Sequence, residues 1–162
     1  MRILTIAAAL TLAGCASAVY DSLERRGVDA KAVLIERVME LRADTAAAKS
    51  SMDGAKTALA AIDGLEGAAL ARQIDHARAA GEDAALAAQG VRLSSDSMKT
   101  AAGRYFAARE EELSLLKTSE ENLRAAEEEL ARATGAYRAY VSTLDAASLR
   151  LSPALSLYDA EV

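Results

Sequence analysis

The residue of this chain that is best placed for chemistry is its only cysteine, Cys15. An apolar run at residues 3–12 precedes it, with Arg2 before the run and the small residues Ala13 and Gly14 after it. A run of about ten apolar residues has the length of the hydrophobic part of an export signal and is too short to span a bilayer. A thiol at the end of such a run is a candidate for covalent modification next to a cleavage point.

The segment around the cysteine resembles the lipobox of bacterial lipoproteins, since it reads Leu12, Ala13, Gly14 and Cys15. This resemblance implies that the Cys15 thiol receives a diacylglycerol and that cleavage leaves it as the acylated N-terminus. Each buried methylene of an acyl chain contributes about 0.8 kcal/mol to membrane attachment. Ala16 follows instead of aspartate, which by resemblance to enterobacterial sorting implies the inner leaflet of the outer membrane, facing the periplasm. An ordinary signal peptide cleaved after Ala16 or Ala18 is the alternative.

Other side chains that could support catalysis or bind a metal lack partners at the required spacing. His76 is the only histidine, and Gln73 stands where a Glu-x-x-His metal motif would need an acid. Consecutive glutamates at 110–112 and 127–129 would point about 100° apart on a helix, so they cannot converge on one ion. No second histidine or nucleophile turn accompanies the serines. We therefore expect no enzymatic activity, no metal and no cofactor.

The composition favours an all-α fold. Hydrophobic residues make up 52% of the 162 residues, but aromatic residues only 4%. About a quarter of the chain is alanine, the best helix former, and the only proline is Pro153. These proportions predict long, slender helices with a thin core.

The charge of the chain argues against two classes of partner. The net charge is −5, and removal of residues 1–14, which contain Arg2 and no acid, would leave −6. An acidic surface without basic clusters disfavours binding to nucleic acid and a polybasic grip on anionic lipid.

The periodicity of apolar residues predicts the first helix from Asp29, which has the side chain of an N-cap. From there a seam recurs at alternating steps of four and three, as in a coiled coil. Its members are Leu34, Val38, Leu41, Thr45, Ala48, Met52, Ala55, Leu59 and Ile62. The alanines in the seam predict a close approach of the helices.

Two further helices are expected. The glycines and acids of residues 63–67 predict a turn, and an apolar stripe predicts a second helix at about 68–117, either continuous or hinged between Gly90 and Ser97. Thr118 and Glu121 fit a capping box that opens a third helix. Pro153 is expected to interrupt that helix and leave a short, frayed end.

Short turns between three long helices predict an elongated antiparallel three-helix coiled-coil bundle. The expected organisation is a lipoprotein signal peptide at 1–14, the acylated cysteine and a tether at 15–28, the helical domain at 29–151 and a C-terminal tail at 152–162.

The chain also resembles a family of uncharacterised bacterial envelope proteins, a domain of unknown function. The resemblance rests on three segments: Tyr20 to Val38, which contains Gly27-Val28, Lys31 and Val33-Leu34-Ile35-Glu36-Arg37-Val38; Val91 to Leu113; and Arg150 to Leu155. That family often has tryptophan at the position of Arg109 and continues beyond the proline. The resemblance implies a periplasmic helical domain and no activity.

The bulkiest side chains suggest either a core or a binding surface. Tyr105, Phe106, Tyr137 and Tyr140 would lie in one region if the second and third helices pair antiparallel. They form an aromatic core or, alternatively, a partner-binding patch that leaves Arg109 and Tyr140 exposed.

We therefore expect a membrane-anchored spacer, scaffold or adaptor that binds an envelope protein or a second copy of itself. The alternatives are a periplasmic binding module for lipid, peptide or cell-wall glycan, and a holdase-type chaperone.

Overall fold

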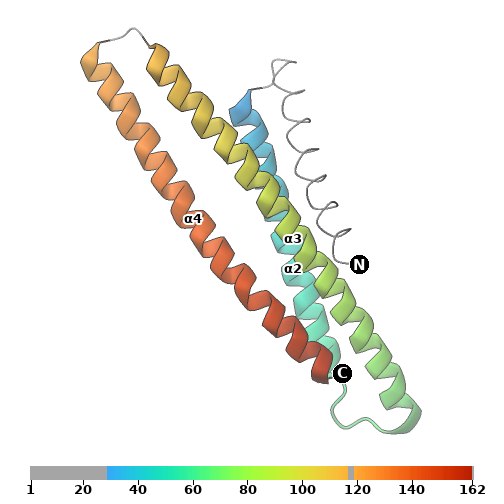
Figure 1. The fold of residues 1–162 in the computed structure, drawn as a ribbon. Helices are drawn as coiled ribbons and strands as arrows, with labels where there is room; N and C mark the ends of the chain where they lie inside the picture. Colours follow the sequence, from blue (N-terminus) through green and yellow to red (C-terminus); the bar gives the residue numbers. More distant parts are fainter. Residues whose placement is uncertain (1–28, 117–118, 162) are drawn as a thin grey trace, which may run out of the picture.

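The computed structural model describes residues 29–116 and 119–161, and within residues 152–161 it describes the backbone and the side chain of Tyr158. This part of the chain folds into three long helices, α2 (Ala30–Ala60), α3 (Gly67–Leu115) and α4 (Glu120–Glu161). They run side by side in alternating directions (Figure 1). The described residues contain no strand, so the prediction of an all-α fold is confirmed.

The turn between α2 and α3 forms where the sequence predicts it. The Asp29 carboxylate caps α2 by accepting a hydrogen bond from the backbone N–H of Lys31, at 3.0 Å. After α2, Gly64 and Gly67 have φ angles of +74° and +56°, a region that side chains with a Cβ rarely adopt. The two glycines therefore let the chain reverse within a few residues.

The N-cap of α4 differs from the prediction. The helix begins at Glu120, and the Ser119 hydroxyl accepts a hydrogen bond from the N–H of Asn122 at 3.4 Å. Ser119 thus occupies the capping position that the sequence assigned to Thr118, which lies outside the described residues. Both residues carry a hydroxyl, so the sequence pattern alone does not separate the two registers.

The prediction that Pro153 interrupts the third helix is wrong, because α4 continues through this position to Glu161. A proline removes one backbone hydrogen bond but need not end a helix that is held on both sides. Beyond the proline, Tyr158 contacts both α2 and α3 and holds the last turns of α4 against the bundle. The expected frayed end is therefore helix.

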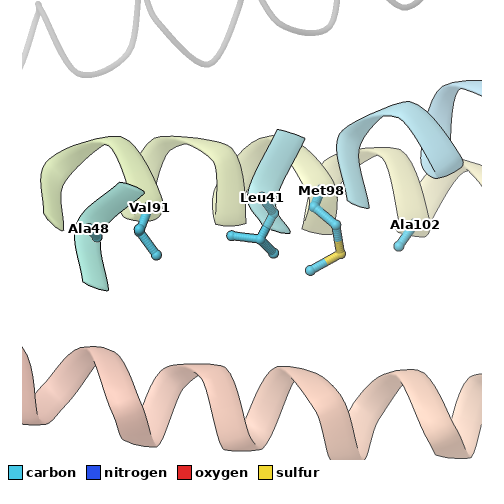
Figure 2. Packing of buried hydrophobic residues seen from close by; sticks show 5 residues of the cluster. All are labelled: Leu41, Ala48, Val91, Met98 and Ala102. Atoms are coloured by element: carbon cyan, nitrogen blue, oxygen red, sulfur yellow. The ribbon is translucent and has the colours of Figure 1, made fainter. Parts of the chain in front are cut away.

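Among the described helices, the tightest packing joins α2 to α3. Small residues dominate this seam, among them Ala48, Ala55 and Ala58 on α2 and Ala77, Ala84, Ala88 and Ala102 on α3, all at most 5% exposed. Leu41 and Met98 are the largest fully buried side chains. Figure 2 shows them with Ala48, Val91 and Ala102, on the side of α2 and α3 that faces α4. Small side chains allow the two helix backbones to approach closely.

Helix α3 is continuous through the region where the sequence left a hinge open. Ser94 and Ser95 are buried there, and the Ser94 hydroxyl donates to backbone carbonyl oxygens of its own helix, at 3.1 Å from Gly90 and 3.2 Å from Val91. Because this hydroxyl is satisfied within the helix, the serine cluster does not break it.

Candidate interaction surface

The seam residues predicted for the first helix fall into three classes of exposure. Leu41 is fully buried and the alanines at 48 and 55 are buried, whereas Thr45 is exposed. The larger members Leu34, Val38, Met52, Leu59 and Ile62 are half-buried. Val33 and Ala58 are buried although the heptad register omits them. The buried line therefore drifts across α2, as expected where a helix does not follow a strict seven-residue repeat.

An aromatic cluster joins α3 to α4. The rings of Tyr105 and Phe106 are 5.2 Å apart between centroids, and those of Phe106 and Tyr137 are 5.4 Å apart. Phe106 and Tyr137 also pack against the core around Leu41 and Met98. Two of the four expected aromatic residues, Phe106 and Tyr137, thus form a core contact, Tyr105 contacts the ring of Phe106, and Tyr140 is 45% exposed.

Arg109 and Tyr140, the two residues suggested as a partner patch, lie at different levels of the bundle. Two contacts mark positions along the α3–α4 interface. The Phe106–Tyr137 ring contact lies nearer to the connection between the helices, and the Lys99–Asp145 ion pair lies further from it. Tyr140 therefore lies between these two levels, and Arg109 lies on the other side of Phe106. The Arg109 side chain pairs with Glu112 on its own helix. The described contacts do not join the two residues into one patch.

An ion pair lies beside the aromatic cluster. The Lys99 Nζ donates a hydrogen bond to Asp145 Oδ1 at 2.6 Å, which links α3 to α4 and raises the pKa of Lys99 above its usual 10.5. Burial raises the pKa of the nearby Tyr137 hydroxyl above its usual 10.0, with Lys99 acting in the opposite direction. The pair and the tyrosine are part of the contact that holds α4 in place.

Tyr158 makes a contact of α4 that the sequence analysis missed. The Tyr158 hydroxyl donates a hydrogen bond to the carbonyl oxygen of Ala77 at 2.6 Å and lies 3.2 Å from that of Ala55. Its ring lies against Gly81, where an added Cβ would be 2.5 Å from Tyr158 Cε1. A glycine within an otherwise apolar stripe was the available signal, because it often marks a close approach.

A second missed contact ties α2 to α3 near their turn. The side-chain amide of Gln73 donates a hydrogen bond to the Ala58 carbonyl oxygen at 2.8 Å. Position 73 thus has a described role in packing, while His76, one turn further along, is exposed.

An open groove of about 650 Å³ lies between the last turns of α3 and the first turns of α4. We call it the α3–α4 groove. Its apolar lining consists of Leu113, Leu116, Leu123, Leu130 and Ala131, and its polar lining of Glu110, Ser114, Glu127, Thr134 and Arg138, with Gly135 completing it. Leu113 is 9% exposed and Leu116 is 50% exposed. An apolar floor with charged edges is suited to binding another apolar surface.

Two further observations concern metal-ligand groups and membrane-spanning helices in the described part of the chain. No group of three or more His, Cys, Asp or Glu side chains there could hold a metal ion. None of the described helices is long and apolar enough to cross a membrane. Cys15 and the lipobox residues Leu12, Ala13 and Gly14 lie outside the described residues.

A model of a protein family of unknown function, DUF2959, matches residues 19–162. This confirms the resemblance to a domain of unknown function, and it leaves the segment that contains Cys15 outside the match. No curated protein and no solved structure matches the chain.

Proposed function

The chain belongs to this family of unknown function, and we propose that it is a membrane-anchored helical adaptor of the bacterial cell envelope. In this proposal Cys15 carries the acyl chains, α2 and α3 form a stiff support, and α4 presents an apolar surface to a protein partner.

The observation that carries the proposal is the difference between the two helix interfaces. The α2–α3 seam is closed, with Leu41, Ala77 and Ala102 fully buried. By contrast, no described side chain of α4 is buried. Its apolar stripe remains half-buried and consists of Leu123, Leu130, Tyr137, Val141, Leu144 and Leu151. A half-exposed stripe of large apolar residues on a long helix is the kind of surface that binds a further helix.

The length of the helices is consistent with a role as a rigid spacer. Helix α3 alone contains 49 residues. At about 1.5 Å per residue, a helix of that length reaches roughly 75 Å. A rod of this length can hold a binding surface well away from a membrane.

The sequence before the helical domain supports the anchor. The apolar run at 3–12 and the lipobox-like residues directly before Cys15 lie ahead of the family match, which begins at residue 19. A signal peptide and a short tether before the folded domain would have this arrangement. The outer membrane, with the domain in the periplasm, remains our proposed location.

The proposal is tested by crosslinking in cells, with an affinity-tagged chain and identification of the products by mass spectrometry. We expect the wild-type chain to be crosslinked to one or two envelope proteins. The Cys15→Ser chain and the Leu123→Asn/Leu130→Asn chain should lose these products. The matched control is Leu86→Asn/Leu93→Asn, which replaces two exposed leucines of α3, 66% and 64% exposed, that do not line the groove.

Two results would contradict the proposal. Crosslinks only between copies of the chain would indicate a self-assembling spacer. Products that persist in Leu123→Asn/Leu130→Asn would mean that the open stripe of α4 is not the binding surface.

The alternative function, a binding module for a small lipid or peptide, has weaker support. An apolar hollow beside Tyr158 and Gly81 measures about 210 Å³. Sites for such ligands usually measure about 300–1,000 Å³. Uptake of a lipophilic dye by the folded chain, blocked by Ala84→Phe at this hollow, would favour the binding module over the adaptor.

A further inference from the structure

The α3–α4 groove lies beyond the start of α2, where α3 and α4 are the only two described helices. Helix α2 begins only at Ala30, and Val33 in its first turn packs against Ala101. Because the two helices run in opposite directions, α3 extends roughly ten residues beyond the start of α2. Figure 1 shows the end of α3 and the start of α4 reaching past α2. At this end the described helices leave the place of a third helix open beside Leu113, Leu123 and Leu130.

The charges around the groove are mainly negative. Glu110 of α3 and Glu127 of α4 line it, and neither takes part in the described ion pairs. The arginines of this region are paired with glutamates on their own helices: Arg109 with Glu112, Arg124 with Glu120 and Arg132 with Glu128. Arg138 is the one cationic side chain among the described residues that line the groove. The unpaired charges therefore favour a cationic occupant.

We propose that the α3–α4 groove binds a basic amphipathic helix of a partner protein, whose apolar face contacts the leucines and whose Lys or Arg side chains lie near Glu110 and Glu127. A helix fits because the groove is bounded by two long helices and continues the position that α2 occupies in the rest of the bundle. The inference rests on the proposed adaptor function and adds the chemistry of the partner.

The test uses a fluorescent model peptide with leucines at helical spacing and lysines on its other face, added to the full chain in phosphatidylcholine vesicles. Fluorescence anisotropy gives the dissociation constant, with empty vesicles as background. We expect the lysine peptide to bind, and its affinity to fall as the salt concentration is raised. Its affinity should also be higher than that of a peptide in which glutamate replaces lysine.

Variants locate the binding site. Leu130→Asn should weaken binding roughly tenfold or more, since it replaces an apolar contact by a polar one. Glu110→Gln/Glu127→Gln should weaken it about fivefold, because two surface charges are lost. The matched controls are Leu86→Asn and Glu82→Gln/Asp83→Asn, which alter exposed residues of α3 away from the groove and should bind as the wild type does.

Other occupants would overturn the inference. Binding that appears only after Leu23→Ser/Arg25→Ser/Arg26→Ser would mean that the chain's own segment before Asp29 covers the groove. A dimer in analytical ultracentrifugation that Leu130→Asn dissociates would mean that a second copy does so. Equal binding by groove and control variants would mean nonspecific attraction. In a last outcome the peptide does not bind, while crosslinking in cells still captures an envelope protein through α4. That result would contradict this inference and leave the adaptor function in place.

Discussion

At the scale of single residues, Tyr158 and Gly81 decide how the third helix is held. The tyrosine hydroxyl reaches backbone carbonyl oxygens on both other helices, at Ala55 and Ala77. This is possible because position 81 has no side chain to keep the ring away from α3. The contact gives the last turns of α4 a fixed position although they follow a proline.

Gly81→Ala should therefore behave unlike other glycine-to-alanine changes in α3. Gly103→Ala, which has no atom within 4 Å of the added Cβ, should raise the free energy of unfolding by about 0.5–1 kcal/mol through helix propensity. Gly81→Ala should be less stable than Gly103→Ala by about 1–3 kcal/mol, because the new Cβ meets the Tyr158 ring. Urea unfolding measures both variants. Equal stability of the two would contradict the described contact.

The raised pKa values of Tyr137 and Lys99 predict a loss of stability in alkali. Both groups keep their protons in the folded chain at a pH where the unfolded chain, with ordinary pKa values of 10.0 and 10.5, loses them. Their stabilising contribution is complete below about pH 10 and falls as the pH rises through the folded-state values. Melting temperatures between pH 8 and pH 11 should fall less steeply for Tyr137→Phe than for the wild type. Tyr140→Phe, a change at an exposed ring, should keep the wild-type profile.

At the scale of elements, the two interfaces of the bundle differ in the size of their residues. Alanines let α2 and α3 approach until their seam is closed. Aromatic and large aliphatic residues, including Phe106, Tyr137 and Val141, join α4 to this pair and remain half-exposed. The closed α2–α3 seam stabilises the fold, and the half-exposed residues of α4 leave an apolar surface for a partner.

Leu41 should therefore matter more to stability than any exposed leucine. Leu41→Ala should lower the free energy of unfolding by about 2–5 kcal/mol, because it leaves a cavity beside Met98 and Val91. Leu86→Ala, at a residue that is 66% exposed, should change it by no more than about 0.5 kcal/mol. Chemical unfolding followed by circular dichroism provides both values. Similar values for the two would argue against the closed seam as the stable core.

At the scale of the whole molecule, the proposed function combines a rod with an anchor. Two closely packed helices of 31 and 49 residues give the rod, and Cys15 would fix it to a membrane. The groove is at the end of the bundle where α2 begins.

Cys15→Ser should remove both acylation and membrane attachment. Growth with an alkyne-labelled fatty acid should label the wild-type chain and leave the variant unlabelled, and the wild-type chain alone should sediment with membranes. Ser17→Ala, a change two residues further on, should be labelled as the wild type is. Labelling of Cys15→Ser would overturn the assignment of the acylation site.

The sequence by itself determined the local structure of this protein. Alanine content and the lack of proline before Pro153 predicted long helices, Asp29 predicted a cap, and the glycines near residue 64 predicted a turn. Such features depend on neighbours within about one helical turn, so a single chain reveals them. The choice of Ser119 over Thr118 was missed because both can cap a helix.

Only the tertiary structure decided how α4 is held and where the surface remains open. Tyr158 lies 81 and 103 positions from its two carbonyl partners, and no local periodicity connects residues so far apart. The groove likewise depends on where α2 begins relative to the end of α3. Helix propensity determines neither the position of α4 nor the place of the groove, because both arise from packing between separate helices. The same packing lets α4 continue past Pro153.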